Sequence, residues 1–104
     1  MTIEEREKLF RLNDDSDEAV SIRLRAAREV AGFKRQRDFS EALGLNYQTY
    51  HSQEKKGRPS PSTVRFLYRN HRIDFNFVYN GDFLQLSGDV QAALEATLSQ
   101  TVQS

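Results

Sequence analysis

The spacing of apolar residues between positions 20 and 31 is the feature that most restricts what this chain can fold into. Four apolar residues recur there at intervals of four, three and four, and so share one face of an α-helix: Val20, Leu24, Ala27 and Ala31. Prolines occur only at positions 59 and 61, and no long stretch alternates apolar and polar residues as a half-buried strand does. The sequence therefore predicts an all-α protein.

Start and stop signals divide the chain into short helices. A capping-box pattern at residues 2–5 predicts a helix of about two turns at the N-terminus. Ser16 can cap a second helix that ends at Gly32, and Gly44 suits the left-handed position after a third. The helices that follow the second are expected over 35–43, 47–55, 61–70 and 75–79, with a last one starting near Ser87. We expect a helical arm over 1–15, a central domain over 16–81 and a C-terminal helical extension over 82–104.

The charges are unevenly distributed along a chain whose formal net charge is zero. Residues 1–22 carry a net −4, residues 23–72 a net +8, and residues 73–104 a net −4. A middle segment this basic is typical of a surface that binds a polyanion, although Lys and Arg that only solvate helices give the same count. The chain contains no cysteine, which excludes a disulfide scaffold and a thiolate metal site and fits a reducing cytosol. No apolar run approaches the length of a membrane span, and the acidic N-terminus does not fit a signal peptide.

Two of the expected helices, 35–43 and 47–55, are joined by the short turn Gly44-Leu45-Asn46. This is the arrangement of a helix-turn-helix, in which the second helix is presented outward and fits the major groove of DNA. Most side chains on its expected outer face are hydrogen-bonding groups and not the Glu/Lys mixture of an ordinary solvated helix: Tyr47, Gln48, His51, Ser52 and Lys55. Any hairpin of two helices shows the same turn, so the pattern also fits a helical domain without this function.

The segment from Val20 to Gly81 resembles the phage repressor/Cro-type helix-turn-helix family, also called the XRE family. The similarity lies in residues 23–29, residues 36–45, Thr49-Tyr50, Glu54 and the apolar closing segment 73–81. It implies a five-helix repressor-like domain with a short N-terminal helix and a C-terminal helical extension. It also implies a bacterial or phage-encoded transcriptional regulator, located in the cytoplasm with the nucleoid, that binds a palindromic duplex operator as a homodimer.

The resemblance implies a role for individual side chains as well. The residues placed to read bases in the major groove are Tyr47, Gln48, His51 and Ser52. The residues placed to contact phosphates are Gln36, Asn46, Lys55, Lys56 and Arg58. Arg28 and Glu54 occupy positions that form an ion pair between the first and third helices of the family.

The apolar stripe of the last expected helix is a candidate dimer interface, formed by Val90, Leu94, Leu98 and Val102. The same stripe equally fits a helix that folds back onto its own core. As an alternative function, the domain is a protein-interaction module, either an adaptor or an antitoxin, that does not bind DNA. No glycine-rich phosphate loop or paired His and carboxylate pattern is present, so we expect neither an enzyme nor a metal, cofactor or small-molecule site.

Overall fold

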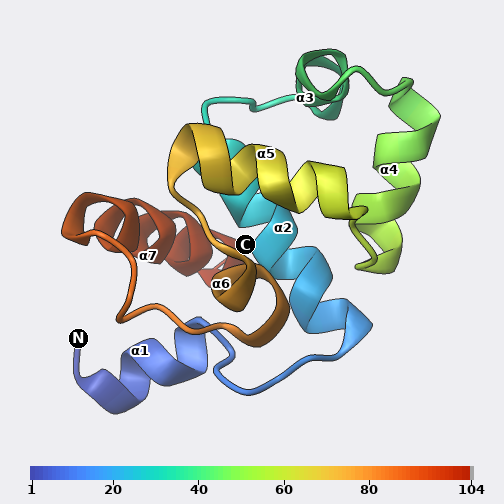
Figure 1. Ribbon diagram of the computed structural model, residues 1–104. Coiled ribbons are helices and arrows are strands. Elements are labelled where there is room, and N and C mark those ends of the chain that lie inside the picture. Colours follow the sequence, from blue (N-terminus) through green and yellow to red (C-terminus); the bar gives the residue numbers. More distant parts are fainter. Residues whose placement is uncertain (104) are drawn as a thin grey trace.

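The computed structural model describes the backbone of residues 1–103 and the side chains of residues 1–100, and all of its regular structure is α-helical (Figure 1). The helices are α1 (Ile3–Leu9), α2 (Asp17–Val30), α3 (Gln36–Leu43), α4 (Tyr47–Lys56), α5 (Pro61–His71), α6 (Phe75–Asn80) and α7 (Gly88–Gln103). The prediction of an all-α protein is confirmed, and each expected helix is present with ends close to those that the capping signals indicate.

Local capping explains where most helices begin and end. The side chains of Thr2, Ser16 and Asn46 each accept a hydrogen bond from a backbone N–H in the first turn of α1, α2 and α4. Gly44 ends α3 in the left-handed conformation, with φ of 73°, which a residue with a Cβ adopts only with strain. The start of α3 differs from these, because its N-cap residue Arg35 makes no side-chain capping bond.

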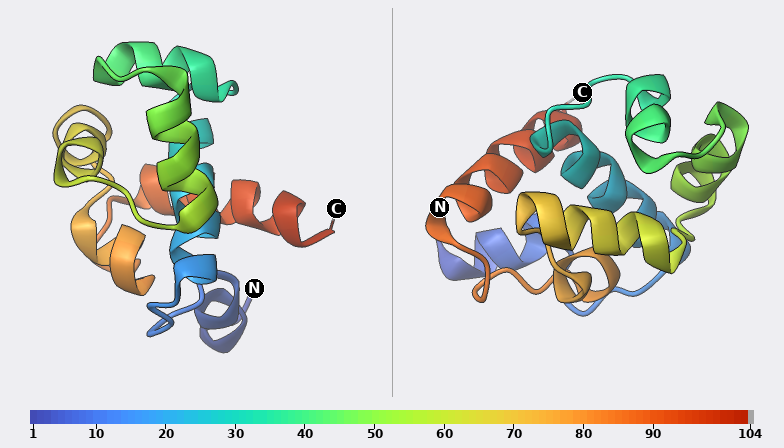
Figure 2. Two further views of the ribbon diagram at one scale, coloured as in Figure 1. Left: turned by 90° about the vertical axis from the view of Figure 1, so that its right-hand side faces the viewer. Right: turned by 45° about the horizontal axis from the view of Figure 1, so that its top comes forward.

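The helix α2 lies at the centre of the fold and packs against α4, α6 and α7. The pair α3 and α4 packs together at one end of the molecule, where α3 also contacts α5. The two views of Figure 2 and that of Figure 1 agree that α1 lies at the opposite end from this pair. The candidate helix-turn-helix is therefore separated in space from the acidic N-terminal helix.

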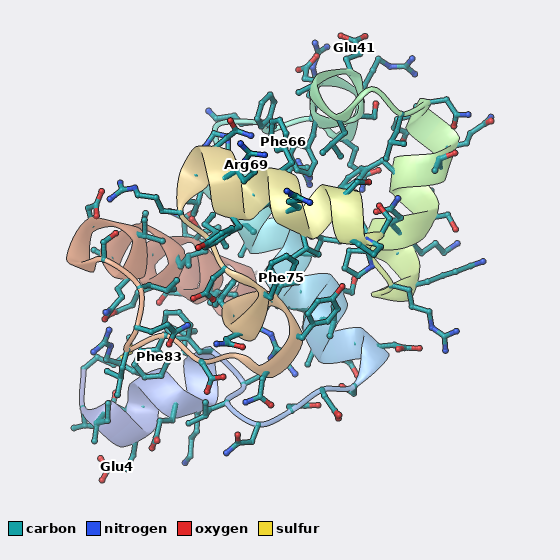
Figure 3. The ribbon with its side chains drawn as sticks, viewed as in Figure 1. Glu4, Glu41, Phe66, Arg69, Phe75 and Phe83 are labelled. Carbon is teal, nitrogen blue, oxygen red and sulfur yellow. The ribbon has the colours of Figure 1, made fainter. Side chains whose placement is uncertain are left out.

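A single cluster of buried side chains joins all three segments that we distinguished in the sequence. It contains Phe10 from residues 1–15, Leu24 from residues 16–81 and Leu94 from residues 82–104, all fully buried. The ring of Phe10 stacks on that of Phe83 with centroids 4.5 Å apart, and Figure 3 shows Phe83 beside α1. The extension and the arm thus complete the core of the central segment.

Arg23 is one of the charged side chains buried in this interior, together with Arg28 and Glu54. Arg23 is fully buried, and its guanidinium donates hydrogen bonds to four backbone carbonyls, those of Phe10, Arg11, Asp14 and Val78. Burial lowers the pKa of Arg23 from its usual range. This arginine fastens the segment after α1 and the end of α6 to α2, a role that we did not predict.

The helix α7 folds back onto the core of its own chain. Val90, Leu94 and Leu98 are 5%, 0% and 1% exposed, and α7 packs mainly on α2 and α1. The prediction that these three residues form a dimer interface is therefore wrong, because their surface is already buried within one chain. Val102, the fourth residue of that prediction, lies outside the residues whose side chains are described.

The helix α3 turns only part of its apolar surface toward the core. Ala42 is exposed and Leu43 is only half-buried. Phe39 is fully buried, and Ser40 beside it is buried as well. Because α3 is short and packs mainly against α4 and α5, a single narrow side of it reaches the core.

Candidate nucleic-acid interface

The helix α4 has a buried inner side and an open outer side. On the inner side Tyr50 is fully buried, with its ring edge-on to that of Phe39 at 4.9 Å between centroids. On the outer side Tyr47 is 37% exposed and Gln48 is exposed, while Ser52 is half-buried. The structure thus places the predicted base-reading residues Tyr47 and Gln48 where a ligand can reach them.

The carboxylate of Glu54 is the centre of a buried hydrogen-bond network that fixes this orientation. It accepts hydrogen bonds from Arg28 Nε on α2 at 2.8 Å, from the Tyr50 hydroxyl at 2.8 Å and from Gln36 Nε2 on α3 at 2.5 Å. Arg28 also donates to the carbonyl oxygens of Phe33 and Lys34 in the loop before α3. The expected ion pair between Arg28 and Glu54 is present, and the same carboxylate joins α2, α3 and α4.

The electrostatics of this network follow from its burial. Burial lowers the pKa of Arg28, but the hydrogen bond and negative charge of Glu54 outweigh it, so that the pKa lies above its usual value. Burial, together with the charge of Glu54, raises the pKa of the Tyr50 hydroxyl well above its usual value. Both groups therefore keep their protons at neutral pH and remain donors to the carboxylate.

Further contacts hold the C-terminal end of α4. The hydroxyl of Ser21 donates to the backbone carbonyl of Glu54 at 2.6 Å, and the side-chain oxygen of Gln53 accepts from the backbone N–H of Ser60 at 3.0 Å. Gly57 ends the helix with φ of 67°, and a Cβ on it would lie 1.8 Å from the carbonyl oxygen of Asp17. The inner side of α4 is thus tied to α2, α3 and the start of α5, which leaves the outer side rigidly presented.

The predicted phosphate-contacting cations are not equivalent in the structure. Lys55 and Lys56 are exposed, and neither has an ion-pair partner within the side chains that the structure describes. Arg58 is also exposed, but it pairs with Asp17 at 3.1 Å. The charge of Arg58 is consequently shared with an acid 41 positions away in the sequence, which we did not anticipate.

The remaining predicted phosphate contacts, Asn46 and Gln36, have partners within the chain. Asn46 is exposed, and its side-chain oxygen accepts the capping bond from the backbone N–H of Thr49 at 2.8 Å. Gln36 donates to Glu54, and its side-chain oxygen lies 2.8 Å from Nδ1 of His51. The structure therefore brings Gln36 together with a predicted base-reading residue instead of leaving its amide free.

Arg37 belongs to this surface although we did not single it out from the sequence. Its guanidinium lies 4.9 Å from the centre of the Tyr47 ring, and that ring stacks on the imidazole of His51 with centroids 5.7 Å apart. The signal that could have pointed to it is the basic segment 34–37, which leads into the first turn of α3. The exposed Arg37 and Tyr47 and the half-buried His51 thus form one continuous group across α3 and α4.

Comparisons with protein-family models, with curated proteins and with solved structures find no match for this chain. In the part of the chain that the structure describes, no group of three or more His, Asp or Glu side chains is arranged to hold a metal ion. Within the same residues, every helix is too short or too polar to cross a bilayer.

Proposed function

We propose that this chain is a repressor-like helix-turn-helix transcriptional regulator that binds duplex DNA by placing α4 in the major groove. The observation that carries the proposal is the division of α4 into an inner side fixed by the Glu54 network and an outer side that presents Tyr47 and Gln48. The major groove admits an α-helix, and a glutamine can pair with adenine through both its donor and its acceptor. A rigid helix with free hydrogen-bonding groups is what such reading requires.

The charges around α4 support the same function. Lys55 and Lys56 are exposed in the last turn of α4, and Arg37 of α3 lies beside the first turn of α4. The first turn of α3 has no side-chain cap, so its backbone N–H groups can also bind a phosphate. Figure 3 shows Glu4 on α1, at the opposite end of the molecule from α3 and α4, so the acids of that helix do not oppose a polyanion that approaches α4.

A second candidate function is a protein-interaction module on the same fold. The observation that favours it is a set of exposed aromatic side chains on α5 and α6: Tyr68, Phe75 and Tyr79, at 53%, 40% and 39% exposure. The rings of Tyr68 and Phe75 lie 6.0 Å apart. Under this alternative the chain binds a protein partner and has no affinity for duplex DNA.

The salt dependence of DNA binding separates the two functions. We expect the affinity for a labelled random-sequence duplex, measured by fluorescence anisotropy, to fall linearly on a double-logarithmic plot against salt. Lys55→Ala should reduce the slope by about 0.9, because one phosphate contact is lost. Lys8→Ala, an exposed lysine on α1, is the matched control and should leave the slope unchanged. Absent or salt-insensitive binding, or equal effects of the two substitutions, would contradict the proposal.

A further inference from the structure

The hydrogen bonds around Glu54 extend through the amide of Gln36 to the half-buried imidazole of His51. They assign a donor or acceptor role to each amide and ring atom in turn. The carboxylate of Glu54 pairs with Arg28, so it is ionised and can only accept hydrogen bonds. The atom of Gln36 that faces it must therefore be Nε2, which is a donor. This turns the side-chain oxygen of Gln36 toward His51, where it lies 2.8 Å from Nδ1.

The amide oxygen in turn decides which nitrogen of His51 carries the proton. An amide oxygen can only accept, so Nδ1 of His51 must be the donor. In the neutral ring Nε2 is then unprotonated and holds a lone pair. Nε2 has no hydrogen-bond partner within the described residues, and it is not among the buried atoms without a partner, so it reaches solvent. The ring presents an acceptor outward.

We propose that Glu54, acting through the amide of Gln36, holds neutral His51 in its Nδ1–H form, so that Nε2 accepts a hydrogen bond from a base amino group in the major groove. This rests on the proposed function of α4. The amino groups available in that groove are N6 of adenine and N4 of cytosine, whereas guanine and thymine present oxygen acceptors that oppose the lone pair. Glu54 is a positioning residue here, and His51 is the residue that discriminates between bases.

The neighbours of His51 are consistent with this role. The ring stacks on Tyr47, over which the cation of Arg37 lies, and its link to Gln36 leads back to Glu54 and Arg28. These contacts fix the plane of the imidazole as well as its tautomer. A base amino group therefore meets a preorganised acceptor, which costs less conformational entropy than ordering a free side chain.

The tautomer is tested without DNA, by long-range proton–nitrogen correlation spectra of the uniformly ¹⁵N-labelled full chain. At about pH 8.5, above the ordinary range of histidine titration, we expect His51 to show a protonated Nδ1 and an unprotonated Nε2. Gln36→Ala should let the ring populate the Nε2–H form, whereas Gln100→Ala, an exposed glutamine on α7, should not. His71, the second histidine of the chain, is the internal reference and should be unaffected by either change. A wild-type His51 protonated mainly at Nε2 would overturn the proposal.

The base-reading step is tested on duplexes selected from a random pool by the wild-type protein. Removing one base amino group at a time, with purine for adenine or 2-pyrimidinone for cytosine, should weaken wild-type binding at one position by about 2- to 10-fold. The same base replacement should not change the affinity of the His51→Ala variant for the duplex. If the duplexes bind but no base replacement weakens the wild type more than His51→Ala, the base-reading role of His51 is overturned and the proposed function stands. If no duplex binds with salt-dependent affinity, both are overturned.

Discussion

Removing the Arg28 side chain is the most direct test of the network that fixes α4. Its side chain is 5% exposed, and it meets a Glu54 side chain that is 7% exposed. Arg28→Ala leaves this carboxylate in the interior with only its hydrogen bonds from Tyr50 and Gln36. Two carbonyls in the loop before α3 lose their donor as well. We therefore expect a strongly destabilised protein.

The expected magnitude follows from the burial of the pair. Breaking a buried ion pair by removing one partner costs about 3–5 kcal/mol, because the remaining charge has lost its compensation. Domains of this kind have a free energy of unfolding of about 5–15 kcal/mol, so the loss is a large share of the total. The ion pair between Arg35 and Asp38 is the matched control, since its side chains are 74% and 41% exposed. Arg35→Ala should cost far less, because an ion pair in contact with solvent contributes little to stability.

Urea unfolding followed by far-ultraviolet circular dichroism measures both variants, with linear extrapolation to water. Arg28→Lys should fall between wild type and Arg28→Ala, because an ammonium keeps the charge but does not reproduce the fork of donors. If Arg28→Ala costs no more than Arg35→Ala, the Glu54 network does not hold α4 in place. The structural argument for a rigidly presented helix would then fail.

Three further predictions follow from the fold. Gly44→Ala should lower the free energy of unfolding by about 1–2 kcal/mol, because alanine is strained in the left-handed conformation of this residue. Gly57→Ala should lower it by about 1–3 kcal/mol more, because its Cβ would also collide with the backbone of Asp17. Equal losses in urea unfolding would count against the close approach of α4 and α2. Leu94→Ala should lower the free energy of unfolding by about 2–5 kcal/mol at any protein concentration, whereas Leu84→Ala, at an exposed position, should change it by less than about 0.5 kcal/mol. A urea midpoint of unfolding that rises with protein concentration would instead indicate a dimer. Hydrogen bonds from Arg72 and Ser87 lower the pKa of Asp89 to about 2, so its contribution to stability is present above its unfolded pKa near 3.9 and is lost as the pH falls toward 2. Thermal melts of wild type and Asp89→Asn should therefore differ at pH 5 and approach each other as the pH falls to 2 and below, and a constant difference would refute this assignment.

The candidate site was predictable in its composition but not in its internal contacts. Tyr47 and Gln48 were identified because a helix after a glycine turn presents its polar side outward. The inward turn of Gln36 toward Glu54 and His51 was not predictable, because it depends on how α3 is placed against α4. Arg58 was predicted to contact a phosphate. Its ion pair with Asp17 was not predictable for the same reason as the turn of Gln36, since Asp17 lies on another helix.

The sequence by itself determined the helices and their limits. A cap such as Asn46 or a left-handed glycine such as Gly44 acts within four or five residues, so its effect is the same in any fold. Only the tertiary structure decided what each helix covers. The stripe of Val90, Leu94 and Leu98 fits a partner chain or its own core equally well. In the structure it packs on its own core, because α1 and α2 present an apolar surface to α7. Burial free energy depends on which surfaces meet in space, and no local spacing of residues contains that information.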